Sequence, residues 1–280
     1  MRLLQALPIL IAACGLIDAG HAQLLVVSNT GPSSVFGGGR RSIPLVLNNR
    51  SGQSVQLDGR ARVFQTTSAT AVQIADKPWK RIQVLPGQTI IESASIDFPA
   101  VRAETRFIVQ WWESTNRVVG TTEVLAYPTN LLHELKQLVT DGEILGVFDP
   151  QNVLKPLLNQ AKVDFADLAA MALEDFRGKL AVILSNGTHA RTPHELTMEI
   201  ATLASKGVAV VWIQRLPENL DKLEPSFYSV VQGAIATVIA QPTLVANLAD
   251  NPRSQLNLIR LCKLSVSPEP PHLPNFDPQP

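Results

Sequence analysis

The distribution of apolar residues differs between the two halves of the chain. From Gln23 to Tyr127 they fall in short runs rich in β-branched and aromatic side chains, separated by clusters of Gly, Pro, Asn, Asp and Ser. Runs of this length and spacing predict β-strands joined by turns. The predicted strands are 24–28, 42–48, 59–65, 80–84, 89–96, 105–113 and 117–125. About seven strands in about 100 residues is typical of a β-sandwich.

The second half contains its clearest pattern at 180–213, where two continuous apolar runs flank a segment with helical periodicity. Continuous runs predict strands that are buried on both faces of a parallel sheet. Thr192, Pro193 and Glu195 are typical of a helix start, because they offer a capping box and a proline at the first helical position. Gly207 is typical of a helix end. This segment therefore predicts a strand, a helix and a second, parallel strand.

Strands and helices alternate through the rest of this half. The predicted helices are 131–140, 153–161, 169–176 and 250–264, and the further predicted strands are 143–148, 163–168 and 228–240. Alternation of this kind predicts a three-layer α/β domain with four or five mostly parallel strands. We place the β-sandwich at 23–127 and the α/β domain at 128–264. Residues 265–280 are rich in proline and are predicted to form a disordered tail.

The first 22 residues predict an export signal. Arg2 is followed by an apolar run, and Ala-Gly-His-Ala at 19–22 places small residues where a signal peptidase reads them. The mature chain is then expected to begin at Gln23 and to be periplasmic or extracellular. As an alternative, Ile-Ala-Ala-Cys resembles a bacterial lipobox, which would make Cys14 the lipid-anchored first residue.

Composition excludes several classes of function. Lys and Arg equal Asp and Glu at 24 each, so the bulk charge does not favour nucleic acid as a partner. No stretch of the mature chain reaches the ~20 apolar residues of a transmembrane helix. Cys262 is then the one remaining cysteine, which excludes an intrachain disulfide and a thiolate metal cluster. No P-loop, dinucleotide fingerprint or HExxH motif is present, so no cofactor or metal is expected.

Two resemblances to known families follow from these patterns. The order of elements in 23–127, with Pro86-Gly87-Gln88-Thr89 turning into a strand and a closing hairpin around Asn116, resembles the immunoglobulin-like domains of exported bacterial proteins. Residues 144–213 resemble the class I glutamine-amidotransferase-like fold, in versions found in exported bacterial proteins and as a non-catalytic domain of some β-galactosidases. The residues that carry this second resemblance are the strand 180–184 with Ser185-Asn186-Gly187-Thr188, the helix start Thr192-Pro193-His194-Glu195, and 206–211.

The catalytic centre of that family is missing from this chain. Catalytic members carry a cysteine on a tight glycine-flanked turn, activated by a downstream His and Glu. No Gly-x-Cys-x-Gly and no Gly-x-Ser-x-Gly elbow occurs, and Cys262 lies in a predicted helix beyond the sheet, where we expect it to be a core residue. The α/β domain is therefore interpreted as a degenerate, non-catalytic version of the fold.

Several polar residues follow the predicted parallel strands, where open α/β sheets place ligands. They are Asp149, Asn152, Asn186, Thr188 and His189. One interpretation is a shared binding crevice. The other is purely structural: Asp149 and Asn152 fit an Asx turn at a helix entry, and His189 and His194 lack a third metal ligand.

Trp111 and Trp112 are consecutive in a predicted strand, so their rings must face opposite sides of the sheet. One ring is expected in the core, and the other is exposed as a binding platform or covered by the second domain.

Together these features predict an exported, non-catalytic binding or assembly module of the cell envelope, with a protein or glycan partner. One alternative is a hydrolase or carbohydrate-processing enzyme that uses Asp149 and His189 as an acid–base pair. Another is a carbohydrate-binding protein that uses the exposed tryptophan.

Overall fold

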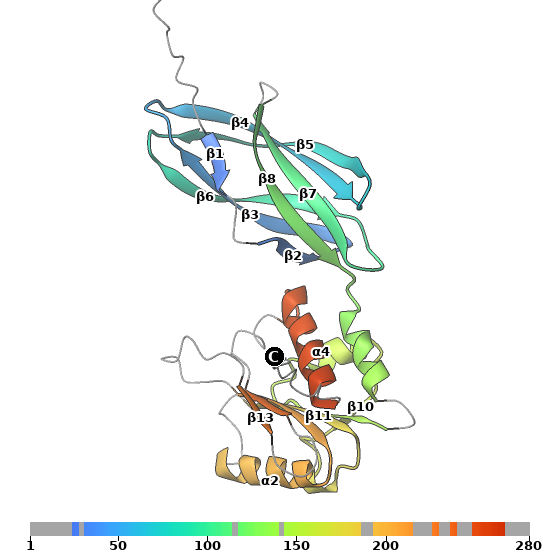
Figure 1. The fold of residues 1–280 in the computed structure, drawn as a ribbon. Helices are drawn as coiled ribbons and strands as arrows, with labels where there is room; N and C mark the ends of the chain where they lie inside the picture. The colour runs from blue at the N-terminus through green and yellow to red at the C-terminus, as the bar shows by residue number, and fades with distance from the viewer. Residues whose placement is uncertain are drawn as a thin grey trace, which may run out of the picture.

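The computed structural model describes residues 24–27, 31–113, 117–139, 143–185, 193–214, 226–229, 236–239 and 248–266. Strands are the dominant element, and a few helices lie in the second half (Figure 1). The predicted export signal with Cys14, and residues 267–280 of the predicted tail, lie outside the described residues.

Residues 24–127 form two β-sheets. The three-stranded sheet is antiparallel, in the order β1-β3-β6, and the five-stranded sheet is mixed, in the order β2-β8-β7-β4-β5. β2 pairs with β8 in parallel, and the other neighbours in both sheets are antiparallel. The strands are β1 (Leu24–Val27), β2 (Ser33–Phe36), β3 (Gly39–Asn49), β4 (Val55–Thr66), β5 (Ala71–Val84), β6 (Thr89–Phe98), β7 (Thr105–Glu113) and β8 (Arg117–Tyr127).

These two sheets share one apolar core because alternate side chains of each strand point inward. In β3, Ile43, Leu45 and Leu47 are buried, while the residues between them are more exposed. Phe107 of β7 packs edge-on against Phe98 of β6, with ring centroids 5.3 Å apart. Buried residues of both sheets belong to a single cluster, so the sheets face each other across it.

Two features of this half differ from the sequence prediction. The described residues of this half form eight strands rather than about seven, because the short segment Ser33–Phe36 pairs in parallel with β8. In addition, β5 begins at Ala71 rather than at residue 80. The first four residues of β5 are exposed, so burial imposes no hydrophobic alternation there, and backbone pairing with β4 alone defines the strand.

The second half contains the predicted parallel sheet, with four strands in the order β10-β9-β11-β12. They are β9 (Leu145–Phe148), β10 (Phe165–Asp167), β11 (Leu180–Ser185) and β12 (Ala209–Gln214). Val182 and Leu184 of β11 pack in a cluster with α4 (Pro252–Val266), whereas Ala181 and Ile183 pack in another with α2 (Pro193–Ser205). The two helices therefore cover opposite faces of the sheet (Figure 1), which explains the continuous apolar runs.

The boundaries of α2 confirm the sequence prediction. The helix begins at Pro193. It ends before Gly207, which has φ +86° and donates its N–H to the Ala204 carbonyl at 3.0 Å. A residue without a Cβ adopts this left-handed conformation at no steric cost, as expected at a helix C-terminus.

Other predicted elements of this half differ from the structure. The predicted helix 131–140 is a 3-10 helix, η1 (Leu131–Leu138). The predicted helix 153–161 is shorter and forms α1 (Lys155–Gln160). The predicted helix 169–176 is reduced to one 3-10 turn, η2 (Leu173–Asp175). Leu168 and Phe176 pack closely over Gly146 of β9, which holds the chain around η2 extended. Of the predicted strand 228–240, the structure describes residues 228–229 and 236–239, which lie in the antiparallel pair β13 (Ser226–Ser229) and β14 (Ala236–Ile239). α4 runs to Val266, two residues beyond the predicted end.

The two halves meet at a contact that we call the seam. Phe36 and Tyr127, at the paired ends of β2 and β8, belong to the same apolar cluster as Leu131, Leu132 and Leu135 of η1 and the buried face of α4. The seam therefore has a continuous apolar core.

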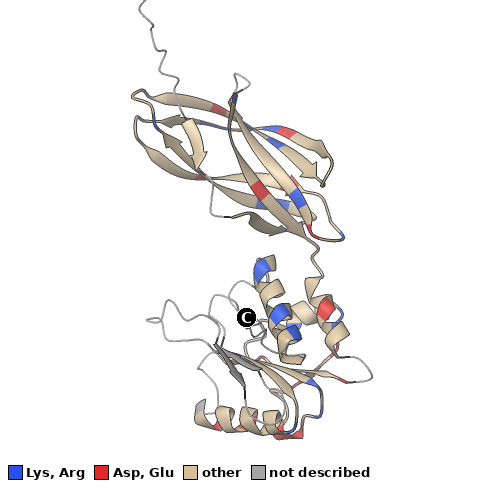
Figure 2. Cartoon of the chain, viewed as in Figure 1, with Lys and Arg blue, Asp and Glu red and all other residues tan. Residues whose placement is uncertain are grey.

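Polar contacts complete the seam. Arg253 of α4 donates Nε to Ser34 Oγ at 2.8 Å and Nη2 to the Pro32 carbonyl. Figure 2 shows that the charged residues of α4 are all basic, and Lys263 pairs with Glu134 of η1 at 2.7 Å. Burial raises the pKa of the Tyr127 phenol, and its hydrogen bond to Glu104 raises it further, so this residue stays neutral.

A substitution at Gly178 tests how tightly the chain packs next to the start of β9. A Cβ at this position would overlap the Ile144 carbonyl oxygen and the Phe176 ring. We expect Gly178→Ala to lower the free energy of unfolding by about 1–3 kcal/mol, because a backbone atom cannot move aside as a flexible side chain can. Urea denaturation measures this change. Gly52→Ala is the control, since nothing lies within 4 Å of its Cβ position, and equal stability of the two variants would contradict the packing.

Candidate functional site

The carboxyl ends of β9 and β11 form the first candidate site. β9 and β11 are adjacent, and the chain leaves β9 for β10 on one side before it returns to β11 on the other. Open α/β sheets bind ligands at such a reversal of strand order. Asp149 follows β9 directly. Asn186, Thr188 and His189 follow β11 but lie outside the described residues, so the structure places only Asp149 and Asn152 of the predicted crevice.

Asp149 is fully buried and serves the entry of α1. Its Oδ2 accepts hydrogen bonds from the backbone N–H groups of Leu154 at 2.7 Å and Lys155 at 3.1 Å. Asn152 is exposed in the preceding turn with φ +54°, and its N–H donates to the Asp149 carbonyl at 3.2 Å. A carboxylate that accepts the unpaired N–H groups of a helix start stabilises the helix. Within the described chain, Asp149 Oδ1 is buried and has no hydrogen-bond partner.

The two consecutive tryptophans lie on opposite faces of β7. Trp111 is the core residue, with 1% of its surface exposed and its Nε1 donating to Thr122 Oγ1 at 2.8 Å. Trp79 packs against it with ring centroids 5.4 Å apart, at the border of the core. Trp111 is therefore not available as a platform.

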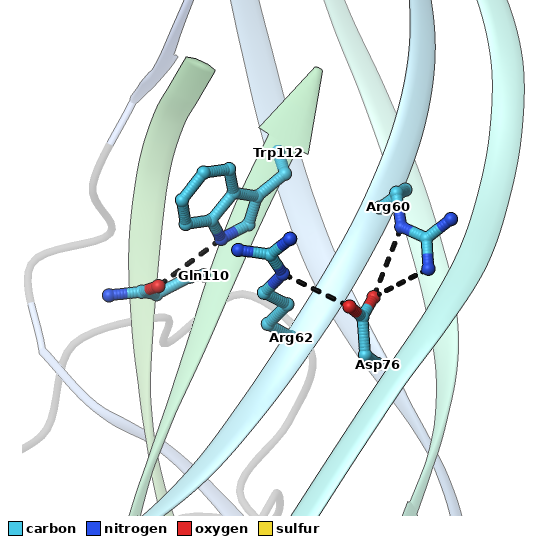
Figure 3. A network of polar contacts seen from close by, with 5 residues as sticks. All are labelled: Arg60, Arg62, Asp76, Gln110 and Trp112. Carbon is cyan, nitrogen blue, oxygen red and sulfur yellow. Dashed lines mark hydrogen bonds and ion pairs between the residues drawn. The ribbon is translucent and has the colours of Figure 1, made fainter. Parts of the chain in front are cut away.

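Trp112 is half-buried on the outer face of the five-stranded sheet (Figure 3). The guanidinium carbon of Arg62 lies 3.9 Å from the centroid of its ring, which is a cation–π contact. Gln110 Oε1 accepts a hydrogen bond from Trp112 Nε1 at 3.2 Å. Both the ring and the guanidinium are thus held in place by neighbours.

Asp76 links the arginines of this face. Its Oδ2 accepts from Arg62 Nε at 3.1 Å, and its Oδ1 accepts from Arg60 Nε at 3.1 Å and Nη2 at 2.9 Å (Figure 3). We call Arg60, Arg62, Asp76, Gln110 and Trp112 the Trp112 surface. Two positive charges and one negative charge leave this surface with one net positive charge beside an aromatic ring.

The sequence predicts that Arg60 and Arg62 lie on one face of a strand, but it does not predict which residues of the neighbouring strands lie beside them. Arg60 and Arg62 are two residues apart in a strand, so they must share a face. Their neighbours are set by register: Arg60 pairs with Trp112, and Arg62 pairs with Gln110 on one side and Asp76 on the other. A register shift between Trp111 and Trp112 in the β7–β8 pairing also adjusts this face.

The remaining candidate chemistry is limited within the described ranges. Cys262 is fully buried in α4, as predicted, and burial raises the pKa of its thiol to about 12. Across the described part of the chain, no three His, Cys, Asp or Glu side chains gather as metal ligands. None of the described helices is long and apolar enough to cross a membrane.

Comparisons with known proteins identify no family. No family model matches the chain, and no curated protein matches its sequence. Among solved structures, an alkylpurine DNA glycosylase from Pseudomonas fluorescens is similar at 13% identity and a TM-score of 0.30, covering 38% of this chain and 30% of the glycosylase. A Niemann-Pick type C2 protein from the Japanese carpenter ant matches at 10% identity and a TM-score of 0.28. The match covers 34% of this chain and 78% of the Niemann-Pick type C2 chain.

A CARDB domain from Pyrococcus furiosus, solved with two metal ions, matches at 16% identity and a TM-score of 0.27, covering 38% of this chain and 94% of that domain. The chain spans less than a third of the glycosylase. Scores of this size support no argument about fold or function.

The first prediction for this site concerns the pKa of Asp76. Burial of the carboxylate raises its pKa, but the hydrogen bonds and charges of Arg60 and Arg62 outweigh burial and lower it below 3.8. The ionised form therefore stabilises the fold above pH 3.8, and this contribution is lost as pH falls through the lowered pKa. Carboxyl NMR titration should show the pKa of Asp76 rising toward 3.8 in an Arg60→Gln, Arg62→Gln variant. Arg81→Gln, which removes the separate pair with Asp58, should leave it unchanged.

The second prediction concerns Cys262. Because the thiolate is the reactive form and burial disfavours it, we expect iodoacetamide at pH 8 to modify native Cys262 at least about a hundredfold more slowly than in urea. Peptide mass spectrometry measures both rates at this residue. Similar rates in the two conditions would show that α4 opens readily.

Proposed function

We propose that the protein is an exported, non-catalytic binding or assembly module of the cell envelope. In this proposal residues 23–127 are an immunoglobulin-like β-sandwich, and residues 128–264 are a degenerate three-layer α/β domain of the class I glutamine-amidotransferase-like type. The alternating burial in the first half and the parallel sheet with helices on both faces in the second are compatible with this assignment.

The single observation that carries the proposal is the ordered Trp112 surface. Tryptophan and arginine are the residues that most often dominate the energy of protein interfaces. Here Asp76 and Gln110 fix Arg62 and Trp112 before any partner arrives, so binding would cost little side-chain entropy. A preordered aromatic and cationic surface is an interface feature and contains no nucleophile.

The chemistry of this surface favours a protein over a glycan as the partner. A sugar ring stacks on a free tryptophan face, and the Arg62 guanidinium leaves at most one face of Trp112 for such stacking. A partner that brings carboxylates would instead pair with Arg60 and Arg62 and extend the existing network. We therefore infer a protein partner that presents acidic side chains beside an apolar residue.

The positions of Asp149 and Cys262 also support a non-catalytic role. One oxygen of Asp149 accepts two backbone hydrogen bonds at the start of α1, and the Cys262 thiol is buried and protonated. Neither group is presented to solvent as an acid, base or nucleophile.

A specific observation keeps the enzymatic alternative as a second candidate. Asp149 Oδ1 is buried without a partner within the described chain, at the reversal of strand order where α/β enzymes place their chemistry. In that hypothesis Asp149 and His189 would form the acid–base pair of a hydrolase or carbohydrate-processing enzyme. The two proposed functions depend on different residues: binding depends on Trp112 and Arg62, whereas the enzymatic alternative depends on Asp149.

The test is capture of envelope proteins from the source cell by the full chain, with and without the Trp112 surface. We expect Trp112→Ala and Arg62→Ala each to weaken binding of the recovered partner at least about tenfold, the effect of removing an interface hot spot. Arg81→Ala is the matched control, because Arg81 forms an exposed pair with Asp58 outside this surface. Affinity is then measured by titration with the purified partner.

Two results would contradict the proposal. If the Trp112→Ala and Arg62→Ala variants bind the partner as tightly as the wild-type chain, the Trp112 surface is not the interface. Turnover of a glycoside or ester substrate by the wild-type chain, abolished in Asp149→Asn while circular dichroism shows an intact fold, would establish the enzymatic alternative instead.

A further inference from the structure

The outer face of the three-stranded sheet differs from the polar surface that a solvent-exposed sheet usually presents. Alternate residues of β3 and β6 point into the core, so the residues between them lie on the outer side. In antiparallel sheets with one buried face, these outer positions are normally polar. Ile91 of β6 lies at such a position, and 80% of its surface is exposed.

Ile91 belongs to a row of apolar residues that crosses all three strands. Val46 of β3 pairs with Ile91 on one side and with Val27 of β1 on the other. Directly opposed residues of neighbouring strands lie about 5 Å apart, so the row is continuous. Leu25 and Pro44 lie on the same side of the sheet and flank the row. We call these five residues the Ile91 face. Single exposed apolar residues are ordinary on protein surfaces, but a contiguous group of them marks an interaction site.

Among the described residues, the Ile91 face and the outer positions beside it carry no charge. Glu92 follows Ile91 in the chain, but it alternates to the other side of the sheet and pairs with Lys80 of β5 at 2.9 Å. The first charged residues on the outer side are Arg40 and Asp97 at one end of the sheet, and they pair with each other at 3.2 Å. A charged partner would therefore form no ion pair with this face, whereas an uncharged apolar surface is complementary to it.

A second copy of the same face satisfies this requirement. Val46 is the middle of the row, so a two-fold axis through it reverses the row and brings Ile91 of one copy to Val27 of the other. The most exposed side chain of the row then packs against one that is 43% exposed. Ser93 and Ser95 of β6 lie on the same side and are small, so a second sheet can approach to the about 10 Å spacing of packed sheets.

The size of the sheet indicates how stable such a dimer is. β3 and β6 are 11 and 10 residues long, and β1 adds 4 residues. With strands about 4.8 Å apart and a rise of about 3.4 Å per residue, the outer face offers roughly 400 Å² per copy. Specific protein interfaces usually bury about 800 Å² per partner, and smaller ones are weak and transient. The area is therefore enough for a reversible dimer but not for a permanent one.

We propose that the protein forms a reversible two-fold dimer through the Ile91 faces of two copies. Ile91 of each copy packs against Val27 of the other, and the two Val46 side chains meet on the axis. The five-stranded sheet lies across the core from this face, so the dimer leaves both Trp112 surfaces open. A partner with two acidic sites would bind both copies more tightly than one. Dimerisation itself does not depend on the proposed function of the Trp112 surface.

Sedimentation equilibrium of the full chain between about 5 and 500 µM measures dimerisation, and we expect a dissociation constant on the order of 10–100 µM. Ile91→Glu should raise this constant at least about tenfold, because the symmetric interface would bury two carboxylates. Since 80% of Ile91 is exposed in one chain, the substitution leaves the fold intact, which circular dichroism checks.

Val72→Glu is the matched control. Val72 is also a large exposed apolar residue, at 59%, but it lies on β5 at the edge of the other sheet. The same charge there should leave the dissociation constant unchanged. Trp112→Ala should also leave it unchanged, so the loss of partner binding and the loss of dimerisation are separable.

A charge exchange tests the two-fold arrangement directly. Val27→Lys alone should weaken dimerisation as Ile91→Glu does. A chain that carries both substitutions should dimerise more tightly than either single variant, because each lysine then faces a glutamate of the other copy.

Four results would overturn the proposal. The first is a chain that stays monomeric up to about 500 µM. The second is a dimer that Ile91→Glu does not weaken, or that Val72→Glu weakens equally. The third is a double variant that dimerises no better than the single variants. The fourth is a monomeric chain whose captured envelope partner is lost with Ile91→Glu, which would assign the Ile91 face to a different protein.

Discussion

Burial of Phe36 and Tyr127 at the seam is the interaction on which the rest of the arrangement depends. These residues are paired across β2 and β8, so they close one edge of the five-stranded sheet. They also belong to the apolar cluster that underlies the parallel sheet, with η1 and α4. Separating the halves would expose Phe36 and Tyr127 on one side and the apolar residues of η1 and α4 on the other, which disfavours separation. Arg253 reinforces the contact by donating hydrogen bonds to Ser34 and Pro32.

The Trp112 surface and a pocket at the seam depend on this contact to different degrees. The Trp112 surface is built entirely from β4, β5 and β7, and its geometry follows from pairing within one sheet. The pocket at the seam has walls from both halves, so it exists only while they are docked. The geometry of the Trp112 surface does not require this docking.

Buried polar groups separate structural from functional positions in this molecule. Asn49 is fully buried, and its Nδ2 donates to the carbonyls of Gln53, Val84 and Leu85 while its Oδ1 accepts from Ser51. Its hydrogen-bonding capacity is used by the turn it stabilises. Gln255 Oε1 and Asp149 Oδ1 are buried to a similar degree, yet each lacks a donor within the described chain. A satisfied group is explained by the fold alone, whereas an unsatisfied one requires a further explanation.

The sequence by itself determined most strands of the first half, though not β2 or the start of β5. It also determined the parallel strands with α2 between β11 and β12, and the burial of Cys262. These features depend on local periodicity, capping and turn residues, and all of these signals come from residues that are close together in the sequence. Only the tertiary structure decided the exposed start of β5, the pairing of β2 and the conversion of 169–176 into a 3-10 turn, since contacts distant in sequence override weak local preference. The same reason explains the Trp112 surface. Strand register brings Arg62 to Trp112, and these two residues are too far apart in the sequence for a local pattern to reveal the contact.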